Sequence, residues 1–242
     1  MLDVIYTYFN QSNLLETYIN HWNNNLSKEI RQKINFIIVD DYSTKKAIDV
    51  IRNKNINFNL QCYYITENKG YNTGGARNLG VCKSKNSNIL ILDFDMVVYE
   101  SLLQELLKWE INEQICYRFQ QCTIRGFNFE KNKLDYKVLN SAMYLKKSIY
   151  VKAGGYDEDF SGNYGYEDVY FRDCLKDIYN IKFKYINKNK IWLDPTGGCR
   201  DANRIEQQKI NKKLFLQKKK KYKKPNNILR FKYDIEFSNS IL

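Results

Sequence analysis

The chain has 242 residues, 43% of them hydrophobic and 15% aromatic, so it can bury a sizeable core and is not a disordered chain. The formal net charge of +12 suits nucleic acid, an anionic membrane surface or a phosphorylated small molecule. The distribution of the charge along the sequence is needed to choose between these partners.

Apolar runs alternate with amphipathic segments in the first half, which predicts parallel strands joined by crossover helices. Strands are expected at residues 2–9, 34–39, 60–65 and 89–92. Ser12 or Asn13 can cap a helix that extends to about Asn24. A short helix is expected through residues 48–51, and another begins near Gly75 after a glycine-punctuated loop.

The second half is less regular. Strands are expected around residues 115–129 and 141–145 and in the short runs 181–186 and 190–193, and helices at 147–153, from Glu167 onward, and at 201–221. We find no internal repeat and no proline-rich linker, so a single domain is predicted.

Polar groups follow the ends of the first four expected strands. They are Thr7, the pair Asp40 and Asp41, the stretch 68–75, and Asp93 with Asp95. Ligands of open α/β sheets gather outside the carboxyl ends of the strands. The sequence therefore predicts a ligand site at this edge.

Asp93 and Asp95 lie two residues apart at the end of an apolar run, where both carboxylates can hold one hard cation. Oxygen ligands without Cys or His favour magnesium or manganese. Such a cation would neutralise a diphosphate leaving group. Two turn acids that cap the next helix would give the same pattern, and the motif alone does not separate the two.

Two helix starts carry further candidate groups. Gly74, Gly75 and Arg77 could add positive potential at a helix N-terminus, although a Gly-Gly pair is often only a tight turn. Glu167 and Asp168 open another helix, where acids are common for electrostatic reasons alone and where one of them could also act as a general base. Aromatic side chains in the loop before it could hold a sugar ring: Tyr156, Phe160, Tyr164 and Tyr166.

Five motifs occur in one order over roughly residues 2 to 200: VIYTYFN, FIIVDDYST, NKGYNTGGARNLG, LDFDM, and GGYDEDF followed by GYED. Together they resemble GT-A fold glycosyltransferases of the family 2 type. The C-terminal part is similar to that of the β-1,4-galactosyltransferases and bacterial chondroitin polymerases. Five ordered motifs are much more specific than any one of them.

For donor binding, the resemblance implies that Thr7 and Asp41 lie against the nucleotide base and that Arg77 lies near the donor. Asp93 and Asp95 match the DxD motif, whose second acid usually binds the metal, Mn²⁺ or Mg²⁺, directly. Asp93 is also expected to bind the donor. Tyr164 and Gly165 belong to the loop expected to hold the donor sugar.

For catalysis, Asp168 matches the acid that serves as base in inverting members of the family. It would deprotonate an acceptor hydroxyl for attack at the anomeric carbon, opposite the leaving nucleotide. Glu167 matches the neighbouring acid that binds the acceptor or donor sugar.

The chain departs from its relatives at several places. They often have Trp where Tyr164 stands and a second Gly where Tyr166 stands, so the sugar pocket here is expected to be reshaped. Many supply a downstream histidine as a metal ligand, but this chain has no histidine after His21. Asp194 is the candidate replacement, and a simple strand-end turn before Pro195 is the other interpretation.

Much of the positive charge is concentrated in Lys218–Lys224, after the last expected helix. This run fits either a solvated helix end or a peripheral contact with an anionic membrane or polymer, and no nucleic acid partner is expected. The chain has six cysteines without a CxxC pair, no signal segment and no run of transmembrane length. These features predict a cytoplasmic protein.

Two other classes fit part of the sequence. A haloacid dehalogenase-like phosphatase would use Asp93 as nucleophile and Asp95 as acid and base, but it leaves DDYST, GGARN and GYED unexplained. A basic polymer-binding module would use the lysines and tyrosines, but the tyrosines are spread throughout without a binding pattern.

The sequence thus predicts a metal-dependent transferase that moves a sugar from a UDP-sugar to a hydroxyl of a polysaccharide, lipid-linked glycan or protein acceptor, with inversion. Gal, GalNAc or GlcNAc is favoured by the galactosyltransferase-like end. The expected organisation is a GT-A domain over residues 1–200, with a mixed, Rossmann-like sheet flanked by helices. Within it, residues 1–96 bind the nucleotide and 97–200 form the acceptor and catalytic half, and 201–242 form a basic helix and tail.

Overall fold

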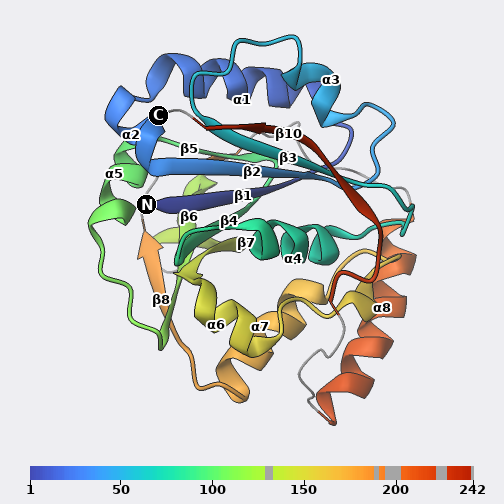
Figure 1. The fold of residues 1–242 in the computed structure, drawn as a ribbon. Helices are drawn as coiled ribbons and strands as arrows, with labels where there is room; N and C mark the ends of the chain where they lie inside the picture. Colours follow the sequence, from blue (N-terminus) through green and yellow to red (C-terminus); the bar gives the residue numbers. More distant parts are fainter. Residues whose placement is uncertain (129–132, 188–190, 194–202, 222–227, 241–242) are drawn as a thin grey trace.

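A computed structural model describes residues 1–128, 133–187, 191–193, 203–221 and 228–240 (Figure 1). The strands are β1 (Leu2–Tyr8), β2 (Ile34–Asp40), β3 (Asn59–Ile65), β4 (Asn88–Asp93), β5 (Met96–Val98), β6 (Ile115–Asn128), β7 (Lys133–Lys146), β8 (Lys182–Asn187), β9 (Ile191–Leu193) and β10 (Tyr233–Asn239). The helices are α1 (Ser12–Asn25), α2 (Lys28–Lys33), α3 (Ala47–Ile51), α4 (Thr73–Lys83), α5 (Glu100–Lys108), α6 (Lys147–Ala153), α7 (Glu167–Asp177) and α8 (Arg204–Lys219), with the 3₁₀ turn η1 (Glu158–Phe160).

Within the described part of the chain, eight strands form one sheet in the order β10-β3-β2-β1-β4-β7-β6-β8, and β5 pairs with β9 in a separate small sheet. The segment β3-β2-β1-β4 is parallel, and β7 and β10 join it antiparallel. The mixed sheet flanked by helices is therefore confirmed.

The register of the parallel strands lines up their carboxyl ends. Thr7 is opposite Val39 on one side and Asp93 on the other, and Tyr8 is opposite Asp40. The polar residues that follow these strands therefore emerge at one edge of the sheet, as the sequence predicts.

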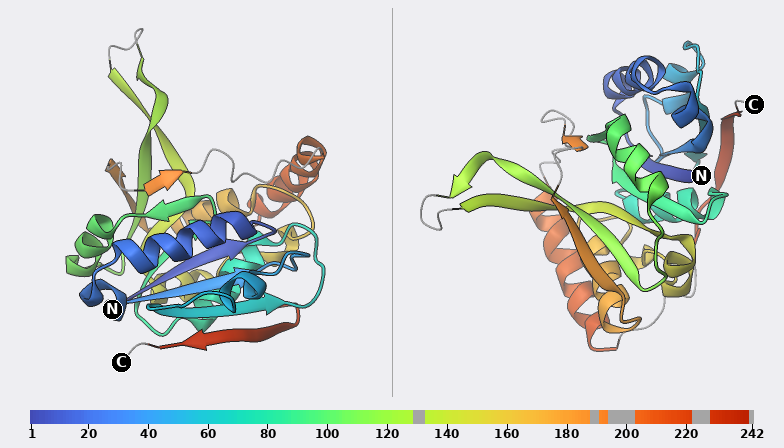
Figure 2. Two further views of the ribbon diagram at one scale, coloured as in Figure 1. Left: turned by 90° about the horizontal axis from the view of Figure 1, so that it is seen from above. Right: turned by 90° about the vertical axis from the view of Figure 1, so that its left-hand side faces the viewer.

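The side chains of the central strands point alternately to the two faces of the sheet, and each face has its own hydrophobic core. Val4 and Phe36 face one layer, whereas Ile5 and Ile37 face the other, because successive side chains of a strand point to opposite faces. Helices α1, α3 and α5 contribute to the first core, and α4, α6 and α7 to the second. Both faces of the sheet are thus covered (Figures 1 and 2).

Several elements differ from the expectation. Helices α2 and α5 and strand β5 are present where no element was predicted, and β7 begins at Lys133 rather than Ser141. With β6 it forms a long hairpin that projects from the body of the molecule (Figure 2). The segment expected to be a tail contains β10, which pairs with the edge strand β3.

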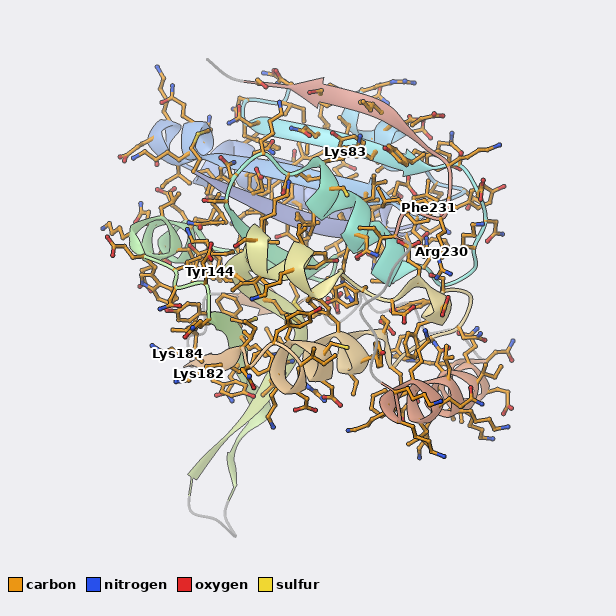
Figure 3. All side chains as sticks on the ribbon, turned by 60° about the horizontal axis from the view of Figure 1, so that its bottom comes forward. Lys83, Tyr144, Lys182, Lys184, Arg230 and Phe231 are labelled. Atoms are coloured by element: carbon orange, nitrogen blue, oxygen red, sulfur yellow. The ribbon has the colours of Figure 1, made fainter. Side chains whose placement is uncertain are left out.

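The approach to β10 is held against α4 and η1. Glu158 accepts hydrogen bonds from the backbone nitrogens of Leu229 (2.6 Å) and Arg230 (2.9 Å), and the buried ring of Phe231 lies against Gly75 (Figure 3).

None of the described helices is long and apolar enough to cross a membrane.

Candidate active site

A cavity of about 490 Å³ opens at the carboxyl edge of the parallel strands. Its lining combines the ends of β1, β2 and β4 with the loop before α4, the loop before α7 and the first turn of α8. Five of the predicted site residues line it: Thr7, Asp41, Asp93, Asp95 and Tyr164.

Asp40 and Asp41, at the end of β2, face different surroundings. Asp40 accepts hydrogen bonds from the backbone nitrogens of Ser43 (2.9 Å) and Ala47 (2.8 Å), so it holds the turn and the start of α3. Asp41 lines the cavity. Its Oδ2 accepts from the Asn72 nitrogen at 3.0 Å, while its buried Oδ1 has no partner among the described residues.

Burial raises the pKa of Asp41 to about 7; the Asn72 amide opposes this shift, and the nearby Asp40 adds to it. Asp41 therefore exchanges its proton near neutral pH, where most carboxyl groups are fully ionised. A ligand that donates a hydrogen bond would favour the ionised form.

The buried Arg77 forms an ion pair with Asp93 of the cavity lining. The Arg77 side chain is 2% exposed, and its Nη2 pairs with Asp93 Oδ1. Ser141 of β7 donates its hydroxyl to Asp93 Oδ2, so both carboxylate oxygens are engaged. The Arg77 guanidinium also lies 4.9 Å from the centre of the Tyr156 ring.

Asp95 lines the cavity two residues beyond Asp93. Within the described ranges no group of three or more His, Cys, Asp or Glu side chains could hold a metal ion, and Asp194 lies outside those ranges. Magnesium-type ions are commonly bound by one or two carboxylates together with substrate phosphates. The carboxylate of Asp95, with Asp93 beside it, would fit a hard cation of that kind.

Glu167 and Asp168 begin α7, which meets the beginning of α4. A Cβ added at Gly74 would lie 3.7 Å from Glu167 Cγ and 3.2 Å from Tyr156 Cβ, so the two helix starts are in close contact. Neither acid is part of the described cavity lining. Glu167 is buried beside Arg77, whereas Asp168 is half-exposed and accepts a hydrogen bond from the Val169 nitrogen at 2.7 Å.

The Glu167 carboxyl group has a pKa raised to about 7, first by burial and then by the neighbouring Asp168, while Arg77 opposes the shift. Its buried Oε2 has no hydrogen-bond partner in the described part of the chain. The two adjacent acids therefore differ, since one is buried and titrates near neutral pH and the other is half-exposed.

The loops before α4 and before α7 are joined directly. The Gly162 nitrogen donates to the Tyr71 carbonyl at 2.9 Å, and a Cβ added at Gly70 would lie 3.1 Å from Gly162 Cα. Ser161 Oγ donates to Asn72 Oδ1 at 2.6 Å. Because Asn72 also donates to Asp41, a hydrogen-bonded chain connects the end of β2 with the loop before α7.

Gly165 is near the cavity without lining it. Its φ of +90° is a conformation that side chains disfavour, and its carbonyl accepts from Asn211 Nδ2 of α8 at 2.8 Å. Gly165 thus connects the loop to α8.

Tyr71 of the lining stands within the stretch 68–75, which the sequence places at this edge. Ser141, Arg204 and Gln207 were not expected at the site. Ser141 and the α8 residues reach the site only through tertiary packing, and no local pattern marks them.

A model of the family "Glycosyl transferase family 2" matches residues 3–215. An uncharacterised glycosyltransferase of Haemophilus influenzae is 25% identical over 173 residues, which cover 67% of this chain and 68% of that protein.

Two solved structures resemble the fold. A mannosyltransferase from Pyrobaculum calidifontis in complex with GDP-Man and Mn²⁺ matches with a TM-score of 0.56 and 16% identity, covering 77% of this chain and 55% of that chain. Residues 1–349 of S. aureus TarS in complex with UDP-GlcNAc match with a TM-score of 0.54 and 17% identity, covering 82% and 59%. This chain thus spans just over half the length of each. The fold is that of GT-A glycosyltransferases.

Proposed function

Because this chain belongs to glycosyl transferase family 2, we propose that it transfers a sugar from a UDP-sugar to an acceptor hydroxyl with inversion at the anomeric carbon. One observation carries the proposal: a single cavity contains Asp41, Asp93, Asp95 and Tyr164, and the buried Arg77, paired with Asp93, connects it to Glu167 at the start of α7. Gal, GalNAc or GlcNAc is the favoured sugar, on the resemblance of the C-terminal part to galactosyltransferases.

The base end of the proposed donor site is formed by Thr7 and Asp41. Asp41 lines the cavity, and its buried Oδ1 has no hydrogen-bond partner among the described residues. This oxygen can therefore accept the N3–H of uracil. Leaving it unpaired costs free energy that a uracil base would recover. This supports a base that presents an N–H donor, as uracil does.

The proposed metal, Mn²⁺ or Mg²⁺, is held by Asp95 together with phosphate oxygens of the donor. When bound, the cation neutralises negative charge on the leaving diphosphate. Asp93 acts as a fixed neighbour, since Arg77 and Ser141 engage both of its oxygens. Asp194 stays a proposed third ligand.

In the proposed transfer, Asp168 accepts the proton of the acceptor hydroxyl as that oxygen bonds to the anomeric carbon. The bond from this carbon to the diphosphate oxygen breaks on the opposite face. Glu167, with its pKa of about 7, is partly protonated at neutral pH and can donate a hydrogen bond to a sugar hydroxyl. Tyr164 and Gly165 belong to the loop that covers the sugar.

The family match argues against a phosphatase, because the haloacid dehalogenase-like interpretation leaves the DDYST, GGARN and GYED motifs unexplained. A non-enzymatic polymer-binding module has no need of the buried Glu167 at the start of α7.

The Lys-rich end is proposed to contact an anionic membrane or polymer, through fewer lysines than its sequence suggests. Lys218 pairs with Asp157 and Asp159, each at 2.6 Å, and Lys219 pairs with Asp173 at 3.2 Å. These two lysines hold α8 to the domain.

The acceptor itself can be a polysaccharide, a lipid-linked glycan or a protein.

The test is calorimetric titration of UDP, GDP and their common sugar conjugates into the protein with Mn²⁺ and then with EDTA. We expect UDP-sugars to bind, with affinity that falls in EDTA. The Asp95→Asn variant should bind alike in both buffers. If no nucleotide binds the wild-type protein with Mn²⁺, the proposal is wrong.

A further inference from the structure

One face of α8 is directed at the candidate site. Residues at helical spacing along it contact the loop before α7, the cavity or the small core beneath: Arg204, Gln207, Gln208, Asn211 and Phe215. The spacing of three and four residues places all of them on one stripe. From the sequence alone, this helix is expected only as a basic end.

The stripe is anchored firmly. Asn211 is 1% exposed, and its Nδ2 lies within hydrogen-bonding distance of the carbonyls of Phe160 (3.1 Å), Asn163 (2.8 Å) and Gly165 (2.8 Å). One turn later, the Phe215 ring packs 5.4 Å from the ring of Tyr166. These contacts fix the position of α8 relative to the cavity.

The first turn of α8 extends this docking into the cavity wall. Gln207 Oε1 accepts a hydrogen bond from the Tyr164 nitrogen at 3.1 Å, and the Arg204 guanidinium lies 3.8 Å from the centre of the Tyr164 ring. Tyr164 in turn packs edge-on against Tyr71 with ring centres 4.9 Å apart. A guanidinium stacked in this way loses little further freedom when it binds an anion.

Charge singles out Arg204 among these groups. The cavity lining contains three carboxylates, Asp41, Asp93 and Asp95, and Arg204 is the only Lys or Arg among its described residues. No carboxylate of a described residue forms an ion pair with Arg204. Arg77 lies close by but is already paired with Asp93.

We propose that Arg204 binds the diphosphate of the nucleotide, which makes α8 part of the donor site. This inference rests on the proposed function. The planar guanidinium presents donors in a fork that matches phosphate oxygens. Because Arg204 lines the same cavity as Asp41 and Asp95, it reaches the ligand that these acids are proposed to hold.

The test compares Arg204→Gln and Arg204→Lys with Lys212→Gln, which removes one charge from an exposed position of the same helix. Each variant is titrated with uridine and with UDP, in Mn²⁺ and in EDTA, after its melting temperature has been compared with that of the wild type. Loss of charge-assisted hydrogen bonds should weaken UDP binding about 10- to 100-fold in Arg204→Gln. Uridine binding should change less than about twofold, Arg204→Lys should be intermediate, and Lys212→Gln should match the wild type.

The outcomes that overturn the inference differ from one another. If Arg204→Gln binds UDP like the wild type but loses transfer to an acceptor, the arginine serves an acceptor phosphate or carboxylate instead. If uridine and UDP weaken equally, it only supports the wall of the pocket. If the wild-type protein binds neither UDP nor uridine, the proposed function fails first.

Discussion

At the residue scale, adjacent carboxyl groups in this protein have unlike surroundings. Asp40 holds a turn while Asp41 lines the cavity, and Glu167 is buried while Asp168 is half-exposed. In each pair, one backbone step turns the second side chain away from the first. Two of these four groups, Asp41 and Glu167, have a pKa of about 7, which makes pH a direct probe of the site.

Binding of UDP-GlcNAc should tighten about tenfold between pH 6 and pH 8, because the pKa of Asp41 is about 7 and only its ionised form accepts the uracil N3–H. The diphosphate of this ligand does not titrate in that range. Calorimetry across this interval measures the effect. Asp41→Asn should bind more weakly and lose the dependence, whereas Glu167→Gln should keep it; a persistent dependence in Asp41→Asn would assign it to another group.

The same carboxyl groups should affect stability with the opposite sign. Their pKa values are raised in the folded protein, so the folded state holds protons that the unfolded state has released. The contribution of these two groups to the free energy of unfolding without ligand should therefore fall as the pH rises from about 4 to about 7. Urea unfolding at several pH values measures this, and Asp41→Asn should flatten the slope.

Asp168→Asn should lower the rate of transfer by at least about 100-fold and leave UDP binding within about twofold, because an amide cannot accept the acceptor's proton. Transfer from a UDP-sugar and calorimetry with UDP measure the two effects. Asp177→Asn, at an exposed position of the same helix, serves as a control for the loss of one carboxylate. Transfer that survives in Asp168→Asn would remove this residue as the base.

At the scale of elements, the start of α7 is the most unusual local structure. Tyr166 precedes the helix with a φ of +72°, a left-handed conformation that costs a residue with a side chain about 1 kcal/mol. Relatives often have glycine here, which adopts the conformation freely. Tyr166 instead packs its ring against Phe215 of α8, so the strain accompanies the docking of α8.

Tyr166→Gly should therefore be more stable than Tyr166→Ala by about 1 kcal/mol, the reverse of the usual order of the two residues. Both variants lose the ring contact with Phe215, so their difference isolates the backbone term. Chemical unfolding of the two proteins measures it. Equal stabilities, or a more stable alanine variant, would show that position 166 carries no strain.

The elements differ in how well local patterns reveal them. Strands β1, β2 and β4 are largely buried apolar runs; β2 and β4 end in acids and β1 ends in Thr7 and Tyr8, so both the strands and Thr7, Asp41, Asp93 and Asp95 could be predicted. Strand β10 is half-exposed along its length, without a continuous apolar run, and it is ordered by its pairing with β3. Ser141 and Arg204 join the site through packing between distant segments, which no local spacing records.

At the scale of the whole molecule, residues after 200 complete two parts of the fold, the wall of the cavity and the edge of the sheet. Helix α8 contacts the loop before α7 and forms part of the cavity wall, while the segment before β10 binds Glu158 and β10 covers the edge of β3. The two elements lie on different sides of the domain (Figure 1). The end of the described chain is thus integral to both the sheet and the candidate site.

Removal of residues 228–242 should destabilise the protein by about 4 kcal/mol, since it removes the buried Phe231 and two hydrogen bonds to Glu158. It should also promote aggregation, because β3 becomes an open edge strand. Thermal unfolding and light scattering measure these effects. Phe231→Ala should reproduce part of the loss and Ile235→Ser, at an exposed position, none of it; a truncated protein as stable as the full chain would contradict the prediction.

The pairing of β10 with β3 also bears on how the protein is made. On a ribosome, residues 59–65 emerge long before residues 233–239, yet the two segments are neighbours in the finished sheet. During that interval the nascent chain carries an uncovered sheet edge, which is open to pairing with other chains. Synthesis of this protein therefore has a vulnerable period that lasts until β10 has been made and has paired with β3.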